Sequence, residues 1–248
     1  MPSNAPQTRF LASVRSVEEA QLCGDAGADV IDCKDPDHGA LGALPHDLVR
    51  AIRRAVPAHV PVSATVGDLI ADPAAMSAAA TAMAATGVDF VKIGFFPGGQ
   101  ARAAIHALSP LAANGTRLVG LLLADRDPDF GLIAAMGSAG FAGVMLDTAS
   151  KNAGALPDVM PRARLEAFLV LARAAGLFSG LAGSLRLNHV VPLLALKPDL
   201  LGFRGALCRA GDRRGVLDRH AVEAVRDAIP AAAGTWFGTG AARQHEVT

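Results

Sequence analysis

The chain has 248 residues, 51% of them hydrophobic, and its formal net charge at pH 7 is zero. The balanced charge argues against a nucleic-acid-binding protein and against adsorption to an anionic membrane, and no apolar run approaches the roughly 20 residues that span a bilayer. The length is sufficient for one large domain with a packed core.

The N-terminus and the cysteines favour a cytoplasmic protein. The first residues, MPSNAPQTRF, lack the basic segment and apolar stretch of a signal peptide. Cys23, Cys33 and Cys208 show no CxxC or Cys/His spacing, so we expect reduced, buried thiols. The histidines show no metal-ligand spacing, and we expect neither a metal nor another cofactor.

Short apolar, β-branched runs alternate along the chain with helical patterns. This alternation predicts strands at 10–14, 30–34, 60–66, 90–95, 117–123, 143–147, 178–183 and 200–204. It predicts helices at 16–27, 46–55, 73–86, 100–113, 129–138, 162–175, 188–194 and 218–229. Start signals such as Ser16 and Asp72-Pro73 precede several of the helices, and glycines end several.

Eight strands alternating with eight helices predict an α/β fold, a single (β/α)₈ TIM barrel. We place the barrel at 9–230 and expect 1–8 and 231–248 to be loose terminal segments. An open doubly wound sheet is the alternative, but no GxGxxG motif follows the first strand. Segment 73–86, rich in Ala and Met, indicates subunit contacts, and we expect a homo-oligomer.

Charged residues gather where the predicted strands end. Catalytic groups of a TIM barrel lie at the C-terminal ends of its strands. Three of the four lysines of the chain lie there, Lys34, Lys92 and Lys151, whereas Arg occurs 19 times. Asp32 and Asp147 occupy the same strand ends. Because Arg cannot replace Lys as an amine nucleophile, the placement of these few lysines indicates a function.

The alternation of side chains along a strand predicts which of these residues face one another. Asp32 and Lys34 point to one face, and Cys33 points to the other. Lys92 shares a face with Gly94, which would leave room for a ligand. If these faces point into the barrel, the lysines and aspartates converge on one mouth.

Several lysines and aspartates in one pocket suit Schiff-base chemistry. An amine attacks a carbonyl when burial or neighbouring cations lower its pKa. The imine then acts as an electron sink for forming or cleaving a carbon–carbon bond, while carboxylates such as Asp32 and Asp147 move protons. The alternative is that each Lys–Asp pair only holds strand ends together. The residues alone do not choose between Lys34, Lys92 and Lys151 as the imine lysine.

The last two predicted strands end in residues that suit a phosphate site. LAGSL places Gly183 and Ser184 there, and FRGAL places Arg204 and Gly205. TIM barrels often bind phosphate at this position through backbone N–H groups, which small residues allow to approach the anion. Arg204 can add charge-assisted hydrogen bonds. The alternative is an ordinary turn, and the basic segment GDRRG (211–215) is either a loop over the mouth or a solvated turn.

Six motifs occur in order between about residues 10 and 230: IDCKDPDHGALGA, PVSATVGD, DFVKIG, MLDTASK, LAGSL and FRGALCRAGDRRG. Together they resemble the (5-formylfuran-3-yl)methyl phosphate synthase family of methanofuran biosynthesis, although no single motif is specific. The chain departs from the family pattern at the fifth predicted strand, where LLLADRD contains no tyrosine. We expect Asp125 to take over a polar role there.

The resemblance implies a TIM barrel that acts as a carbon–oxygen lyase on phosphates. Two molecules of glyceraldehyde 3-phosphate would condense through a lysine Schiff base into (5-formylfuran-3-yl)methyl phosphate, with loss of phosphate and water. No metal or redox cofactor would be required. The resemblance implies that Lys34 is the Schiff-base lysine. It implies further catalytic positions at Asp32, Lys92, Asp147 and Lys151.

Two other functions fit the same residues. One is another class I aldolase that acts on a phosphorylated sugar, with Lys151 rather than Lys34 forming the imine. The other is a catalytically silent barrel that binds a phosphorylated metabolite within a larger complex. Trapping of the imine separates the first from the resemblance, and turnover of a triose phosphate separates the second.

Overall fold

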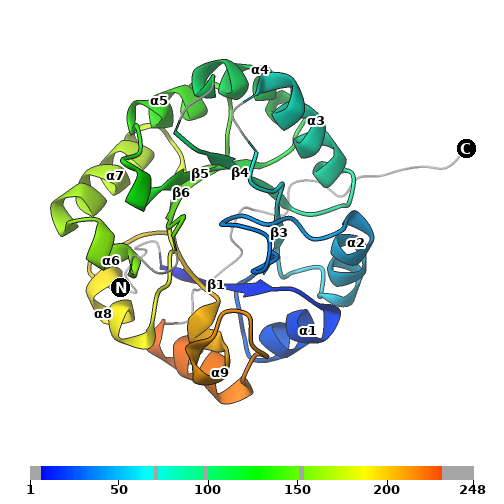
Figure 1. Cartoon of the computed structure of the whole chain (residues 1–248), viewed down its shortest axis with the longest axis vertical. Helices are drawn as coiled ribbons and strands as arrows, with labels where there is room; N and C mark the ends of the chain where they lie inside the picture. The colour runs from blue at the N-terminus through cyan, green and yellow to red at the C-terminus, as the bar shows by residue number, and fades with distance from the viewer. Residues whose placement is uncertain (1–6, 70–71, 98–99, 151–153, 231–248) are drawn as a thin grey trace, which may run out of the picture.

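Eight parallel strands form a closed barrel at the centre of the molecule (Figure 1). The computed structural model describes residues 7–69, 72–97, 100–150 and 154–230. The strands are β1 (Arg9–Val14), β2 (Val30–Cys33), β3 (Val62–Thr65), β4 (Phe90–Phe95), β5 (Leu118–Leu123), β6 (Gly143–Asp147), β7 (Phe178–Leu181) and β8 (Leu200–Phe203). Each strand pairs with the next along the chain, and β8 pairs with β1, which closes the ring. The TIM barrel that the sequence predicts is therefore confirmed.

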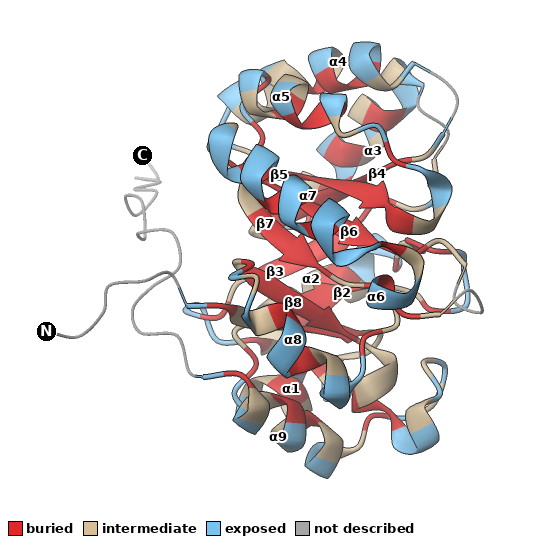
Figure 2. Ribbon diagram, turned by 90° about the vertical axis from the view of Figure 1, so that its left-hand side faces the viewer, coloured by how far each residue is buried: buried red, intermediate tan, exposed pale blue. Residues whose placement is uncertain are grey.

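Helices surround the barrel, and their outer faces meet solvent (Figure 2). They are α1 (Val17–Asp25), α2 (His46–Ala55), α3 (Pro73–Ala84), α4 (Ala101–Ala113), α5 (Gly131–Ser138), α6 (Leu156–Val159), α7 (Arg162–Ala174), α8 (Val190–Leu194) and α9 (Arg219–Ala228). The predicted start signals act as caps, since Ser16 accepts from the Glu19 N–H and Asp72 from the Ala75 N–H. Among the described residues, none of the helices is both long and apolar enough to span a bilayer.

The structure differs from the predicted elements mainly at their ends. β7 stops at Leu181 because Gly183 and Ser184 both have positive φ angles, 111° and 49°, which no strand accommodates. Helix α6 has four residues, too few to show a helical period in the sequence. Thr8 lies within the predicted loose N-terminal segment, yet it is buried and donates to the Pro198 carbonyl at 2.6 Å. Residues 1–6 and 231–248 lie outside the described part of the chain.

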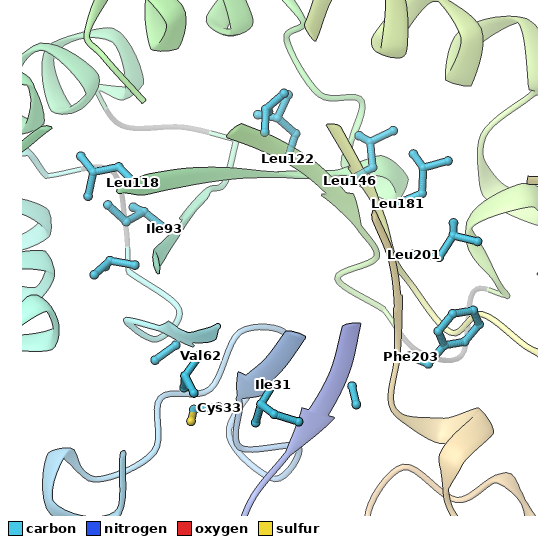
Figure 3. Packing of buried hydrophobic residues seen from close by; sticks show 14 of the residues in the cluster. Ile31, Cys33, Val62, Ile93, Leu118, Leu122, Leu146, Leu181, Leu201 and Phe203 are labelled. Atoms are coloured by element: carbon cyan, nitrogen blue, oxygen red, sulfur yellow. The ribbon is translucent and has the colours of Figure 1, made fainter. Parts of the chain in front are cut away.

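The apolar core has two parts, one on each side of the strands. The larger part lies between strands and helices and includes Ile31, Leu146 and Leu201 (Figure 3). The smaller part fills the barrel and includes Leu11 and Met145. Alternate residues of each strand therefore face different layers, and a polar residue that faces inward must find its partners inside the barrel.

The cysteines give a direct test of this packing. Burial raises the pKa of the Cys23 thiol to about 12 and also raises the pKa values of Cys33 and Cys208. Because the thiolate is the reactive form, we expect iodoacetamide at pH 8 to leave all three thiols unmodified in the folded chain and to modify all three in urea. Mass spectrometry of the alkylated protein measures this. Rapid native labelling of Cys33, which lies in the outer core (Figure 3), would contradict the packing described here.

Candidate active site

A cavity of about 1150 Å³ opens at the carboxyl ends of the strands. Its lining includes eight of the nine residues that the sequence predicts for the site: Asp32, Lys34, Lys92, Asp147, Gly183, Ser184, Arg204 and Gly205. The ninth, Lys151, lies outside the described residues. Residues that are up to 173 positions apart in the sequence, from Asp32 to Gly205, thus face one space.

Asp32 forms a buried ion pair with Lys92. The distance from Lys92 Nζ to Asp32 Oδ1 is 3.0 Å, and the two side chains are 6% and 2% exposed. Ser13 and Ser63, which lie opposite Asp32 in the strand register, donate their hydroxyls to its two oxygens at 2.9 and 2.6 Å. A carboxylate with an ammonium and two hydroxyls around it is held in one orientation.

Lys34 forms a second pair, with Asp147. Its Nζ lies 2.8 Å from Asp147 Oδ2, and the side chains are 13% and 8% exposed. The other oxygen of Asp147 accepts from the Thr148 N–H at 2.7 Å. Since β2 and β6 are four strands apart in the eight-strand ring, this pair crosses the mouth of the barrel.

In these two ion pairs, the partners are therefore not the residues nearest in the sequence. Asp32 and Lys34 share the inner face, as the alternation predicts, and Cys33 lies in the outer core. Each of the two residues nevertheless has its partner on another strand, Lys92 for Asp32 and Asp147 for Lys34. An amine and a carboxylate at 2.8 Å, partly open to a cavity, can exchange a proton with each other and with a bound carbonyl compound.

The sequence suggested that Gly94 would leave room for a ligand, but the structure shows no such room. A Cβ placed on Gly94 would collide with Leu41 Cδ1 and would lie 2.9 Å from Phe96 Cε2. The space beside this glycine is already occupied by Leu41, from the connection between β2 and α2. Gly94 therefore serves the packing of that connection.

Asp125 organises the segment that follows β6. Its two carboxylate oxygens accept from the N–H groups of Ala149 and Ser150, each at 2.7 Å. The sequence predicts a polar role for Asp125. In the structure, its carboxylate binds backbone N–H groups just before Lys151. The structure does not describe Lys151 itself.

Gly183 and Ser184 form a turn against the end of β6. A Cβ on Gly183 would lie 2.8 Å from Thr148 Cγ2 and 2.9 Å from Thr148 N, so only glycine fits there. Within the described part of the chain, the N–H groups of Gly183 and Ser184 donate to no acceptor. Two unused donors at a cavity wall are suited to an anion.

Arg204 uses its whole guanidinium group within the protein. Its Nη1 and Nη2 donate to the two carboxylate oxygens of Glu19 at 2.5 and 3.1 Å. The other three N–H groups donate to the carbonyls of Ser13, Arg213 and Gly215, at 3.2, 2.8 and 3.2 Å. A phosphate would receive no hydrogen bond from this side chain unless one of the five were exchanged. The contact of Arg204 with phosphate stays a prediction, and what the geometry shows is a tie between β8, α1 and the loop that follows β8.

The structure adds three residues that the sequence did not assign to the site. Ser13 is the inward-facing hydroxyl of β1, which its alternation with Leu11 would have indicated. Asp68 accepts from the N–H groups of Ala40 and Leu41 at 2.8 and 2.6 Å and so holds the connection after β2. Arg213, in the basic segment 211–215, lines the cavity, so this segment is a loop at the mouth.

No group of three or more His, Cys, Asp and Glu is arranged to hold a metal ion in the part of the chain that the structure describes. The cavity brings together two amines, two carboxylates and unused backbone donors. These groups can form an imine, transfer protons and bind phosphate.

Solved structures of similar shape confirm the fold. A 3-hexulose-6-phosphate synthase superposes with a TM-score of 0.62 at 16% identity, over 90% of this chain and 100% of that chain. A phosphoribosyl anthranilate isomerase from Thermus thermophilus gives 0.63 at 16% identity, over 89% and 98%. At these identities the likeness concerns the fold alone.

The sequence comparisons identify the family. A synthase from Methanothermobacter thermautotrophicus, named (5-formylfuran-3-yl)methyl phosphate synthase, is 33% identical over an alignment of 233 positions that covers 89% of this chain and 98% of that protein. A Methylorubrum extorquens protein with the same name, provisionally assigned, is 44% identical over 90% of this chain and 94% of its own length. The family model described as 4-HFC-P synthase matches residues 10–226. The chain belongs to this family, the (5-formylfuran-3-yl)methyl phosphate synthases.

Proposed function

We propose that the chain is an enzyme that converts two molecules of glyceraldehyde 3-phosphate into (5-formylfuran-3-yl)methyl phosphate, a step of methanofuran biosynthesis. Membership of the synthase family supports the product. The observation that carries the mechanism is the Lys34–Asp147 pair, with 2.8 Å between Nζ and Oδ2, at the wall of the cavity. It supplies an amine and a proton acceptor in contact, which imine formation requires.

The proposed reaction starts with attack of Lys34 on the aldehyde of one triose phosphate. Asp147 takes the proton that the amine loses, and water leaves as the imine forms. The imine acidifies the proton at the neighbouring C2, and loss of this proton expels the phosphate from C3. C2 of the second triose phosphate, as its enol, then forms the carbon–carbon bond to this C3. Ring closure with net loss of two water molecules gives the furan, and hydrolysis of the imine releases its aldehyde from Lys34. Because one phosphate is lost by elimination, the enzyme would be a carbon–oxygen lyase acting on phosphates.

Lys92 has a different role in this proposal. It is held by Asp32, which Ser13 and Ser63 orient from both sides. A cation fixed this firmly is suited to stabilise negative charge on a substrate oxygen or on the departing phosphate. The unused N–H groups of Gly183 and Ser184, with Gly205 beside them at the cavity wall, would bind the phosphate that the product retains.

The direct test is turnover. We expect the purified chain, mixed with glyceraldehyde 3-phosphate, to produce the ultraviolet absorbance of a furan aldehyde and one inorganic phosphate per furan formed. Phosphate release and mass spectrometry of the product measure this. Binding of the triose phosphate without either signal would instead indicate a catalytically silent barrel.

Replacement of the proposed imine lysine separates charge from nucleophilicity. Lys34→Arg retains a cation for Asp147 but cannot form an imine, so we expect turnover to fall by at least about 10³-fold. Lys197→Arg is the matched control, because Lys197 is exposed and lies in the turn before β8, away from the cavity. Cyanoborohydride trapping followed by peptide mapping should mark Lys34 in the control and leave Lys34→Arg unmarked. A mark only on the peptide that contains Lys151 would support the alternative aldolase.

Removal of the second cation should affect a later step. Lys92→Gln leaves the buried Asp32 without its ammonium, so we expect the free energy of unfolding to fall by about 3–5 kcal/mol in urea titrations. In the folded variant, we expect trapping at Lys34 to persist while furan formation is lost. Loss of trapping in folded protein would show that Lys92 is required for the imine itself.

A further inference from the structure

The basic residues that line the cavity divide into two groups. Four have a carboxylate partner: Lys34 with Asp147, Lys92 with Asp32, Arg204 with Glu19 and Arg214 with Asp37. Three have none within the described part of the chain: Arg126, Arg186 and Arg213. Guanidinium groups without a direct ion pair at a cavity wall are suited to an anionic ligand, and arginine is well suited to phosphate esters.

Arg213 is the one of these three that also holds the segment next to Lys34. Its Nη2 donates to the carbonyls of Pro36 and of Gly39, the latter at 3.2 Å. Its Nε–H and Nη1–H groups have no acceptor among the described residues. Burial lowers the pKa of this guanidinium, and the Arg214 charge adds to the effect, whereas Asp147 acts in the opposite direction. Arg213 lines the same cavity as Asp147.

The other end of this side chain starts at the predicted phosphate site. A Cβ on Gly205 would lie 3.8 Å from Arg213 Cβ and 3.8 Å from Arg186 Nη1. Arg204 holds the Arg213 carbonyl at 2.8 Å, and Arg186 Nη1 donates to the Gly211 carbonyl at 3.1 Å. Arg213 therefore reaches from the wall beside Gly205 to the backbone that follows Lys34.

The segment that it reaches is short and held by two side chains. It begins at Lys34, whose N–H donates to the Val14 carbonyl at 3.0 Å. Asp68 binds the N–H groups of Ala40 and Leu41, and Arg213 binds the carbonyls of Pro36 and Gly39. A change in the position of Arg213 would be passed to the backbone within two residues of Lys34.

We propose that Arg213 is a positioning residue that binds a substrate phosphate through its unused N–H groups and thereby fixes the segment that carries Lys34. This inference rests on the proposed function, because it assigns a phosphate ester as the ligand and Lys34 as the amine. Phosphate binding energy is then used to place the amine for attack, in addition to retaining the substrate.

The link between phosphate binding and the position of Lys34 can be tested with a substrate that is supplied as two separate molecules. Glyceraldehyde lacks the phosphate, and phosphite dianion supplies it separately. We expect phosphite to accelerate cyanoborohydride trapping of glyceraldehyde at Lys34 by about tenfold or more in the unaltered chain. Arg213→Met should lose this acceleration, so that its trapping rate is the same with and without phosphite, and Arg213→Lys should restore part of it.

The matched control is Arg209→Met, in the same loop. Arg209 is exposed and does not line the cavity, so this variant should keep the full acceleration. Equal acceleration in Arg213→Met and in the unaltered chain would overturn the inference. The inference would also be overturned if Arg213→Met slowed trapping by the same factor with and without phosphite. That result would indicate that Arg213 only supports the loop.

A binding measurement separates this inference from the proposed function. Calorimetric titration with inorganic phosphate does not depend on the imine, and we expect Arg213→Met to weaken the affinity about tenfold or more. Absence of any label at Lys34 with glyceraldehyde 3-phosphate would refute the proposed imine. An unchanged phosphate affinity in Arg213→Met would refute the role of Arg213, whatever the outcome at Lys34.

Discussion

A carboxylate inside a protein is tolerated only when cations and hydrogen-bond donors replace the water that it loses. For Asp32, meeting this requirement involves four strands, its own and three that carry its partners. It is 1% exposed, and its partners come from β1, β3 and β4. A shift of one residue in β1 or β3 would turn a hydroxyl partner of Asp32 toward the outer layer, and the same shift in β4 would leave its charge unpaired. The same contacts that satisfy Asp32 therefore also align the strands around the mouth.

Much of this architecture follows from local patterns in the sequence. The repeated change from a period of two to a helical period predicts the barrel, and the strict alternation in VIDCK places Asp32 and Lys34 inside and Cys33 outside. The position of catalytic groups at strand ends is a property of the fold, so the sequence also places eight of its nine predicted site residues at the cavity wall. These inferences need only short-range spacing.

The partners of long side chains do not follow from local patterns in the sequence. Spacing places Arg204 at the end of β8 but does not reveal that Glu19, 185 residues earlier, takes two of its N–H groups. It places Lys34 beside Asp32 but not opposite Asp147. Such contacts depend on how far a flexible side chain extends across the closed barrel, which no local period encodes. The same holds for Arg213, whose carbonyl partners are 174 and 177 residues away.

The missing side chain at Gly94 has a mechanical consequence. Leu41 occupies the space that a methyl group would take there, and the backbone of Leu41 is anchored to Asp68. An alanine in β4 would force Leu41 Cδ1 and the Phe96 ring to move, because both lie closer than a methyl group allows. Both are outer ends of flexible side chains, so a change of rotamer can make the room without moving the backbone. The absence of a Cβ at Gly94 thus determines how closely Leu41 packs against β4 at the mouth of the barrel.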